Sequence, residues 1–112
     1  MAIGDQTVLQ IAKIVAPATN EKIEYTPDDG EKLLIFKFTG KGNESSLADV
    51  RLYWDLGGAD EELLWALDEL PMPDSVFHEV TGDGTKKVTV CLSNGCVNSY
   101  AMAGQIIMEE IP

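Results

Sequence analysis

Turn signals typical of β-hairpins recur along this chain, between runs in which apolar and polar residues alternate. The clearest are Pro-Asp-Asp-Gly at 27–30, Gly-Asp-Gly at 82–84 and Asn-Gly at 94–95. Asp-Gly and Asn-Gly pairs supply the positive φ angles that tight hairpins need, because the twist of such turns matches that of the paired strands. The pattern therefore predicts a compact, mainly β protein whose strands run antiparallel and are joined by hairpins.

The runs between these signals predict seven or eight short strands. They cover residues 7–16, 22–26, 32–39, 49–56, 75–81, 86–92 and 100–111. The cleanest alternation is 49–56, where every second residue from Val50 is apolar, as in a half-buried strand. A chain of 112 residues is long enough to bury one core without a metal or a disulfide. We therefore expect a single β-sandwich domain over residues 1–112, with two antiparallel sheets in a jelly-roll-like arrangement.

Residues 60–70 are compatible with two structures. As a helix, the segment would begin at a capping aspartate, repeat its leucines at helical spacing and stop at the next proline. As a strand, it would place Leu63, Trp65 and Leu67 on one face. Its position after a Gly-Gly turn favours a hairpin partner for 49–56, because sheet context often overrides local propensity. We expect a strand here, with one short helix as the alternative.

Two predicted strands, 32–39 and 100–111, are apolar on both faces. In the first strand, one predicted face carries Leu34, Phe36 and Phe38, and the other carries Leu33 and Ile35 together with Lys37. In the second strand, one face carries Ala101 and Ala103, and the other carries Met102, Ile106 and Met108. A monomeric sandwich needs one apolar face per strand. The surplus predicts a second buried surface, either an oligomer interface or a sheet face covered by a helix. Gly104, inside the second strand, predicts a bulge or a close backbone approach.

The formal net charge of the chain is −11 at pH 7. A surface this acidic repels phosphate backbones and anionic lipids, so we expect neither a nucleic acid nor a membrane as partner. A basic protein surface is compatible with the charge, and solubility explains it equally well. The first residues lack the basic segment and apolar core of a secretory signal, and no apolar run approaches the ~20 residues that span a bilayer. The sequence therefore predicts a product made in the cytoplasm.

Few residues offer catalytic chemistry. The chain has no nucleophile elbow, phosphate-binding glycine loop or metal-ligand spacing, so we expect no enzyme activity, no cofactor and no metal. His78 stands alone within a predicted strand and is expected to be a packed or solvated side chain. Cys91 and Cys96 are expected to be structural thiols, with a hairpin disulfide as the alternative. The most loop-like segment, 40–47, is the expected place for a functional loop.

A candidate interaction surface consists of Tyr53, Trp65, Arg51 and Asp55. Tyr53 falls on the polar face of its predicted strand, next to Arg51 and Asp55, whereas Trp65 fits either the core or the surface. An exposed tyrosine–tryptophan pair would suit stacking on a sugar ring or a protein hot spot. The alternative is that the tryptophans are ordinary core residues.

The small size, acidic charge, unprocessed start and turn-rich β pattern resemble those of accessory virion proteins of tailed bacteriophages, such as head-decoration or cement proteins. The resemblance implies a sandwich that binds symmetrically to a capsid or tail surface and stabilises the particle. It implies a location in the virion, with capsid or other virion proteins and further copies of the chain as partners. The alternative function is a carbohydrate-binding or adhesin-like module, which requires Tyr53 or Trp65 to be exposed beside polar loops.

Overall fold

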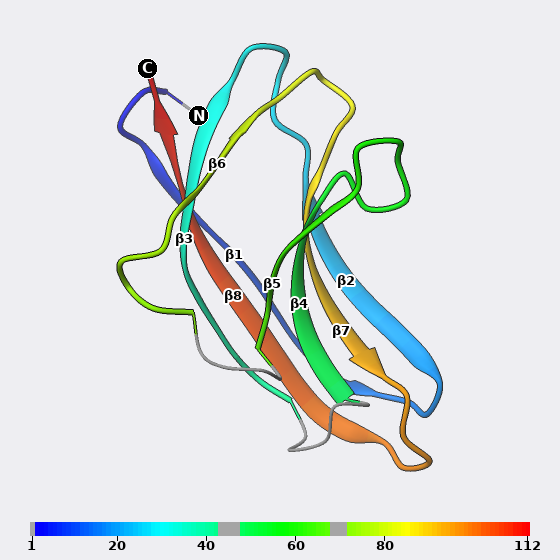
Figure 1. Ribbon diagram of the computed structural model, residues 1–112. Helices are drawn as coiled ribbons and strands as arrows, with labels where there is room; N and C mark the ends of the chain where they lie inside the picture. Colours follow the sequence, from blue (N-terminus) through cyan, green and yellow to red (C-terminus); the bar gives the residue numbers. More distant parts are fainter. Residues whose placement is uncertain (1, 43–47, 68–71) are drawn as a thin grey trace.

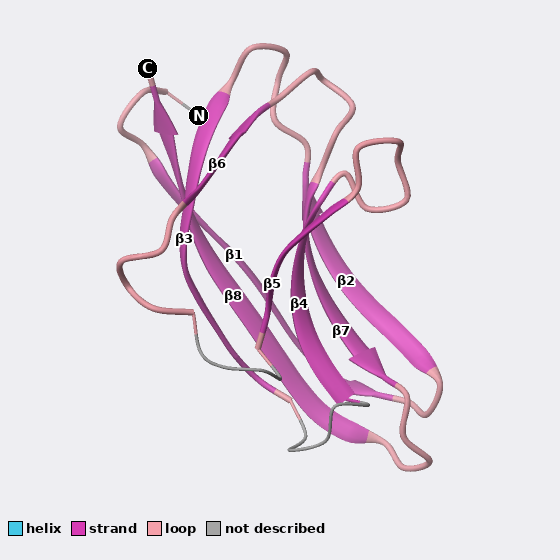
Figure 2. Ribbon diagram, viewed as in Figure 1, coloured by secondary structure: helices cyan, strands magenta, loops and turns pink. Residues whose placement is uncertain are grey.

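The computed structural model describes residues 2–42, 48–67 and 72–112. Over these residues the chain forms eight strands and no helix (Figure 2). The strands are β1 (Gln6–Val15), β2 (Thr19–Tyr25), β3 (Lys32–Lys41), β4 (Ala48–Trp54), β5 (Glu62–Ala66), β6 (His78–Thr81), β7 (Val88–Asn94) and β8 (Tyr100–Ile111). The segments that alternate in the sequence are thus the segments that form strands.

Two four-stranded sheets, ordered β1-β8-β3-β6 and β2-β7-β4-β5, pack face to face (Figure 1). Every strand pair is antiparallel. This strand order is that of an eight-stranded jelly roll, in which two Greek keys divide their strands between the sheets. The expected antiparallel, jelly-roll-like sandwich is confirmed.

The predicted hairpins at 27–30, 82–84 and 94–95 are wrong. The strands on either side of each turn lie in different sheets, so the turns are arches between the sheets. Of the eight described strands, β4 and β5 are the one pair that is consecutive along the chain and also hydrogen-bonded. Gly30 and Gly84 do have positive φ angles, 82° and 85°. A glycine with a positive φ fits an arch between two sheets as well as it fits a hairpin. Which strands pair with each other is therefore decided by burial of their apolar side chains in the core.

The core lies between the sheets. Its side chains come from alternate positions of the central strands, including Val50, Leu52 and Trp54 on β4 and Val88, Val90 and Leu92 on β7. Gly104 of β8 lies close against the opposite sheet. A Cβ at this position would lie 2.7 Å from Val90 Cγ1 and 2.8 Å from Val50 Cγ1. The predicted close approach at Gly104 is confirmed.

A β-bulge in β3 reverses the facing of its second half. The register with β8 shifts between Phe36 and Thr39, and Lys37 has a φ of 51°. Before the bulge Ile35 points into the core, and after it Phe38 does. The expectation that Phe36 and Phe38 share a face is therefore wrong, because an extra residue inserted into one strand moves all later side chains to the opposite face.

Residues 62–66 form the strand β5, so the alternative of a short helix at 60–70 is wrong within its described part; residues 68–70 lie outside the described residues. A second register shift, opposite Leu52 and Tyr53, interrupts the alternation of β5. Leu63 is 48% exposed, whereas Trp65 packs against the core. The predicted common face for these two residues is therefore wrong too.

The predicted loop at 40–47 lies mostly outside the described residues. Its first residues, Gly40 and Lys41, continue β3 and pair with β8. The segment 43–47 is not among the residues that the structure describes.

Candidate functional site on the outer face of the β1-β8-β3-β6 sheet

The outer face of the β1-β8-β3-β6 sheet, which we call the apolar face, carries large apolar side chains that the core does not use. Val8, Ile14 and Phe77 are 50%, 75% and 55% exposed. Leu34, Phe36 and Ile107 on the same face are half-buried. The strand residues among them point away from the core because they alternate with buried residues such as Leu9, Ile35 and Ile106, whereas Phe77 precedes β6 and contacts the Phe36 ring. No helix of the described residues covers this face.

The strand registers arrange the apolar face in rows that run across the sheet. The first row is an apolar ridge made by Val8, Ile107 and Phe36, which Phe77 extends through a ring contact of 6.2 Å with Phe36. The next row is polar and consists of Gln10, Gln105 and Thr39. It is followed by a row of Ala12, Ala103 and Lys41, and then by Ile14 beside Ala101.

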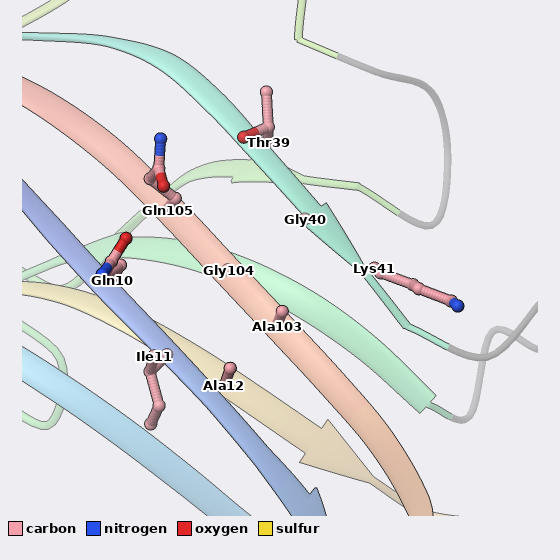
Figure 3. A pocket seen from close by; sticks show the side chains of 9 residues that line it. All are labelled: Gln10, Ile11, Ala12, Thr39, Gly40, Lys41, Ala103, Gly104 and Gln105. Carbon is pink, nitrogen blue, oxygen red and sulfur yellow. The ribbon is translucent and has the colours of Figure 1, made fainter.

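A hollow of about 420 Å³ lies where the polar row meets the row of small side chains (Figure 3). Ala12 and Ala103 form its floor together with the backbone at Gly40 and Gly104. Figure 3 shows the amides of Gln10 and Gln105 in the neighbouring row, with Lys41 extending from the far strand. The hollow exists because the small side chains of Ala12 and Ala103 stand next to the longer side chains of the polar row.

The charged side chains of the apolar face are unevenly distributed. Lys41 lies on β3 toward one end, and Glu79, Glu109 and Lys32 lie toward the other, where Gln6 Nε2 donates a hydrogen bond to Glu109 Oε1 at 2.8 Å. The exposed Lys37 lies in the bulge of β3. The outer face of the opposite sheet is different, because it carries ion pairs such as Lys22–Glu24 at 3.7 Å along its strands. The two outer faces of the sandwich are therefore chemically distinct. The outward residues of β1 from Val8 to Ile14 and of β8 from Ala101 to Ile107 are uncharged and suited to burial.

Arg51 and Tyr53, two of the predicted interaction residues, lie on the outer face of the β2-β7-β4-β5 sheet. Arg51 Nε donates to Asp49 Oδ2 at 2.8 Å, and Asp49 itself is buried. Side-chain hydrogen bonds with Asp49 and Tyr53 raise the pKa of Arg51. Because both bonds hold the guanidinium within its own sheet, this group stabilises the sheet locally.

Trp65 and Asp55, the other two predicted interaction residues, lie elsewhere. Trp65 is opposite a core leucine of β4 and packs against the core. Asp55 follows β4 with a φ of 54°, and its Oδ2 accepts a hydrogen bond from the Asp60 N–H at 3.0 Å. Of the four residues, the structure therefore brings only Arg51 and Tyr53 into contact. Tyr53 and Trp65 do not form a paired aromatic platform, so the carbohydrate hypothesis stays a prediction.

The cysteines and the histidine have structural surroundings. Cys91 and Cys96 are both thiols, as expected, and burial raises the pKa of the Cys91 thiol. Cys96 N–H donates to the side chain of Asn94 at 2.9 Å. His78 lies on the edge strand β6, where burial lowers its pKa and the nearby charge of Glu62 opposes that shift. Its buried Nε2 has no hydrogen-bond partner among the described residues.

A second polar group lies at the end of the sandwich where β8 finishes. Glu31 is 8% exposed and accepts a hydrogen bond from the Tyr25 hydroxyl at 2.7 Å. Burial and this bond raise the pKa of Tyr25 to about 12. Burial acts to raise the pKa of Glu31 as well, but hydrogen bonds with Glu110 and Tyr25 outweigh it and lower the pKa. The same bond with Glu31 raises the pKa of Glu110.

These opposite shifts predict that Glu110→Gln raises the melting temperature at pH 7. A group whose pKa is raised in the folded state stabilises the fold below its unfolded pKa, and that contribution disappears as the pH rises through the folded value. At pH 7 the charged Glu110 therefore opposes the charged Glu31, and the amide removes this repulsion. Thermal unfolding should show the gain at pH 7 and a smaller gain at pH 4, where protonation of Glu110 already relieves the repulsion.

The control for this prediction is Glu79→Gln, which makes the same change of net charge at an exposed residue of β6. It should shift the melting temperature by less than Glu110→Gln at pH 7. Equal shifts for both variants would attribute the gain to the overall charge of −11 rather than to the carboxyl pair.

The apolar face was only partly foreseen. The two-sided apolar pattern of 32–39 and 100–111 indicated apolar residues outside the core, and Leu34, Phe36 and Ala103 do lie on the apolar face. That this face is buried against a partner stays a prediction. Val8 and Ile14 of β1 were missed as site residues. The signal that could have found them is the run from Thr7 to Ala16, which is also apolar at both odd and even positions.

The described residues contain no group of three or more His, Cys, Asp or Glu side chains that could hold a metal ion. The described part of the chain also lacks a helix long and apolar enough to cross a membrane.

No protein-family model matches the sequence, and a comparison with curated proteins finds no significant match.

Proposed function

We propose that this protein is a non-enzymatic structural protein of a multi-subunit particle, of the kind that tailed bacteriophages use to decorate or stabilise their capsids, and that the apolar face is its contact surface. The observation that carries the proposal is the exposure of Val8, Ile14 and Phe77 together on one sheet face. Several exposed large apolar side chains on one sheet face, in a protein that has a core of its own, favour a protein contact there.

Two further features support the proposal. The eight-stranded jelly roll is an architecture that capsid proteins use, although a fold alone never establishes a function. The contact surface also lies on regular strands of a rigid sheet rather than on loops, so it suits a partner surface that is itself flat and repeated. The protein would act in the virion, bound to capsid or other virion proteins.

The proposal predicts that Val8→Lys abolishes association with the particle. Purified wild-type protein, mixed with particles from its source that lack it, should co-sediment with them and saturate at a fixed number of copies. A lysine buried within the contact must lose its water without gaining a partner, or must push the surfaces apart, so the apparent Kd should rise about 10-fold or more. The measurement is the bound fraction after sedimentation over a series of protein concentrations.

The matched control is Leu63→Lys, because Leu63 is 48% exposed on the outer face of the opposite sheet while Val8 is 50% exposed on the apolar face. Leu63→Lys should bind within about 2-fold of the wild type, since surface changes away from a contact have small effects. Wild-type protein that stays in the supernatant at all concentrations would contradict the proposal. If Val8→Lys and Leu63→Lys lost particle binding equally, the apolar face would not be the contact surface.

A further inference from the structure

We infer that the apolar face binds a second copy of this chain, in a two-fold dimer whose axis runs across the strands along the row of Gln10, Gln105 and Thr39. The inference rests on the proposed function only in using the same face, and because one face holds one partner at a time, a dimer of this kind would have to dissociate before that face could contact a particle. Two copies related by such an axis stack their sheets face to face with β1 over β1 and β8 over β8. A two-fold contact requires that one surface be complementary to itself, and three properties of this face meet that requirement.

The first property is a match of large with small side chains. The ridge of Val8 and Ile107 lies two residues from the polar row in one direction along the strands. The small residues Ala12 and Ala103 lie two residues from it in the other direction. Rotation about the polar row exchanges these positions, so the ridge of each copy stands over the hollow of the other. The hollow of about 420 Å³ has the room for those side chains.

The second property concerns the axis itself. Gln10 and Gln105 are neighbours in register, and their side chains lie along the axis. A primary amide carries both donors and acceptors. It can therefore bind its own symmetry copy, whereas a charged residue at the same place would meet a like charge. The polar row thus satisfies its hydrogen bonds across the dimer instead of leaving them unpaired in a dry contact.

The third property is the distribution of charge. The axis turns the two ends of the face toward each other, so Lys41 of each copy lies over Phe36 of the second copy, on the side of the axis that also carries Glu79, Glu109 and Lys32. Opposite charges at the rim of a contact fix its orientation. Copies stacked with their strands parallel would bring the two acidic ends together instead, which selects the antiparallel arrangement.

The area of the face is sufficient for a dimer. Three strands of about nine residues and the four residues of β6, spaced about 4.8 Å apart and rising about 3.3 Å per residue, give a planar area of roughly 490 Å². The accessible area is larger than the planar one because side chains project from the sheet, and it approaches the roughly 800 Å² per partner of a stable contact. Two copies that each carry a charge of −11 repel at long range, so added salt should strengthen the dimer by screening.

The first test is the native mass of the purified protein, measured by light scattering over a concentration series at low and high salt. We expect twice the chain mass at high concentration, a lower dissociation constant in high salt, and a constant raised about 10-fold or more by Val8→Lys. Leu63→Lys is the control and should leave the constant unchanged. A dimer that is weakened by salt, or that is indifferent to Val8→Lys, would overturn the inference.

The second test locates the axis with a short bismaleimide cross-linker. Gln10→Cys places two thiols on either side of the axis, in sheets about 10 Å apart, and should cross-link to a dimer. Gln6→Cys on the same face of β1 is the control: it lies four residues from the axis, which separates its two copies by more than about 25 Å. Both variants carry Cys96→Ser, and Cys91 is buried and reacts slowly because burial raises its pKa.

Cross-linking through position 10 but not position 6 would support the predicted axis, and the reverse or equal yields would overturn it. A monomer at all concentrations would also overturn the inference. That result is distinguishable from failure of the proposed function, because association with particles is measured separately. Monomeric protein that still binds particles in a manner sensitive to Val8→Lys would assign the apolar face to a different partner.

Discussion

Replacing Asn94 by aspartate is expected to lower the free energy of unfolding by about 4 kcal/mol. Asn94 is 1% exposed at the end of β7. Its Nδ2 donates to the carbonyl oxygens of Val15 and Asn98, both at 2.9 Å, and its Oδ1 accepts from the Cys96 N–H. A carboxylate keeps the acceptor but faces the two carbonyl oxygens with a buried negative charge, so both bonds are lost and one charge is left without a counter-ion.

The measurement is chemical denaturation at pH 7, with Asn98→Asp as the control. Asn98 is exposed, and its contact with Asn94 is through its backbone oxygen, so the control keeps that bond and should change stability by less than about 0.5 kcal/mol. If Asn94→Asp were as mild as its control, Asn94 would not hold the end of β1 to the loop between β7 and β8.

Replacing Gly104 by valine is expected to cost about 3 kcal/mol of stability. The first added carbon would lie 2.7 Å from Val90 Cγ1 and 2.8 Å from Val50 Cγ1, both on the opposite sheet. Two sheets that pack through many neighbouring residues cannot separate at one point, so the crowding forces side chains from their preferred rotamers. Denaturant titration should show a lower midpoint with an unchanged slope.

The control for Gly104→Val is Ala103→Val, which adds a β-branched side chain one residue earlier in β8 but on the apolar face. There the chain enters the hollow, so stability should stay within about 0.5 kcal/mol of the wild type. Adding Val90→Ala to Gly104→Val should recover part of the loss by removing one of the two crowded methyl contacts. A double variant no more stable than Gly104→Val would contradict the steric explanation.

The sequence predicted that an apolar surface outside the core exists, but it did not predict which residues form that surface. Apolar residues on both faces of 32–39 and 100–111 indicated a second buried surface. The predicted interaction residues, including Arg51 and Trp65, came instead from the polar face of the predicted strand 49–56 and from the neighbouring segment 60–70. That choice failed to find the apolar face because a strand sequence shows which residues alternate, whereas only the packing of the sheets shows which alternate set is left outside.

Strand positions were the part of the fold that local sequence determined. Period-two alternation of apolar residues predicted β4 and β7 closely, because each side of a strand meets either the core or the solvent. The glycines with positive φ, such as Gly30 and Gly84, were also readable, since side chains at those angles are strained. Both properties depend on a few consecutive residues.

Strand partners and side-chain facing were decided by the tertiary structure alone. An Asp-Gly or Asn-Gly turn bends the chain equally well into a hairpin or an arch, so the pairing of β1 with β8 and of β2 with β7 came from burying apolar area between distant segments. The bulges in β3 and β5 set which side chains face outward after them, and they have no local signal because they adjust one strand to its neighbours. The sequence by itself thus determined an antiparallel sandwich of short strands. The apolar face exists because the packing of the two sheets buries one apolar face of these strands in the core and leaves the other exposed.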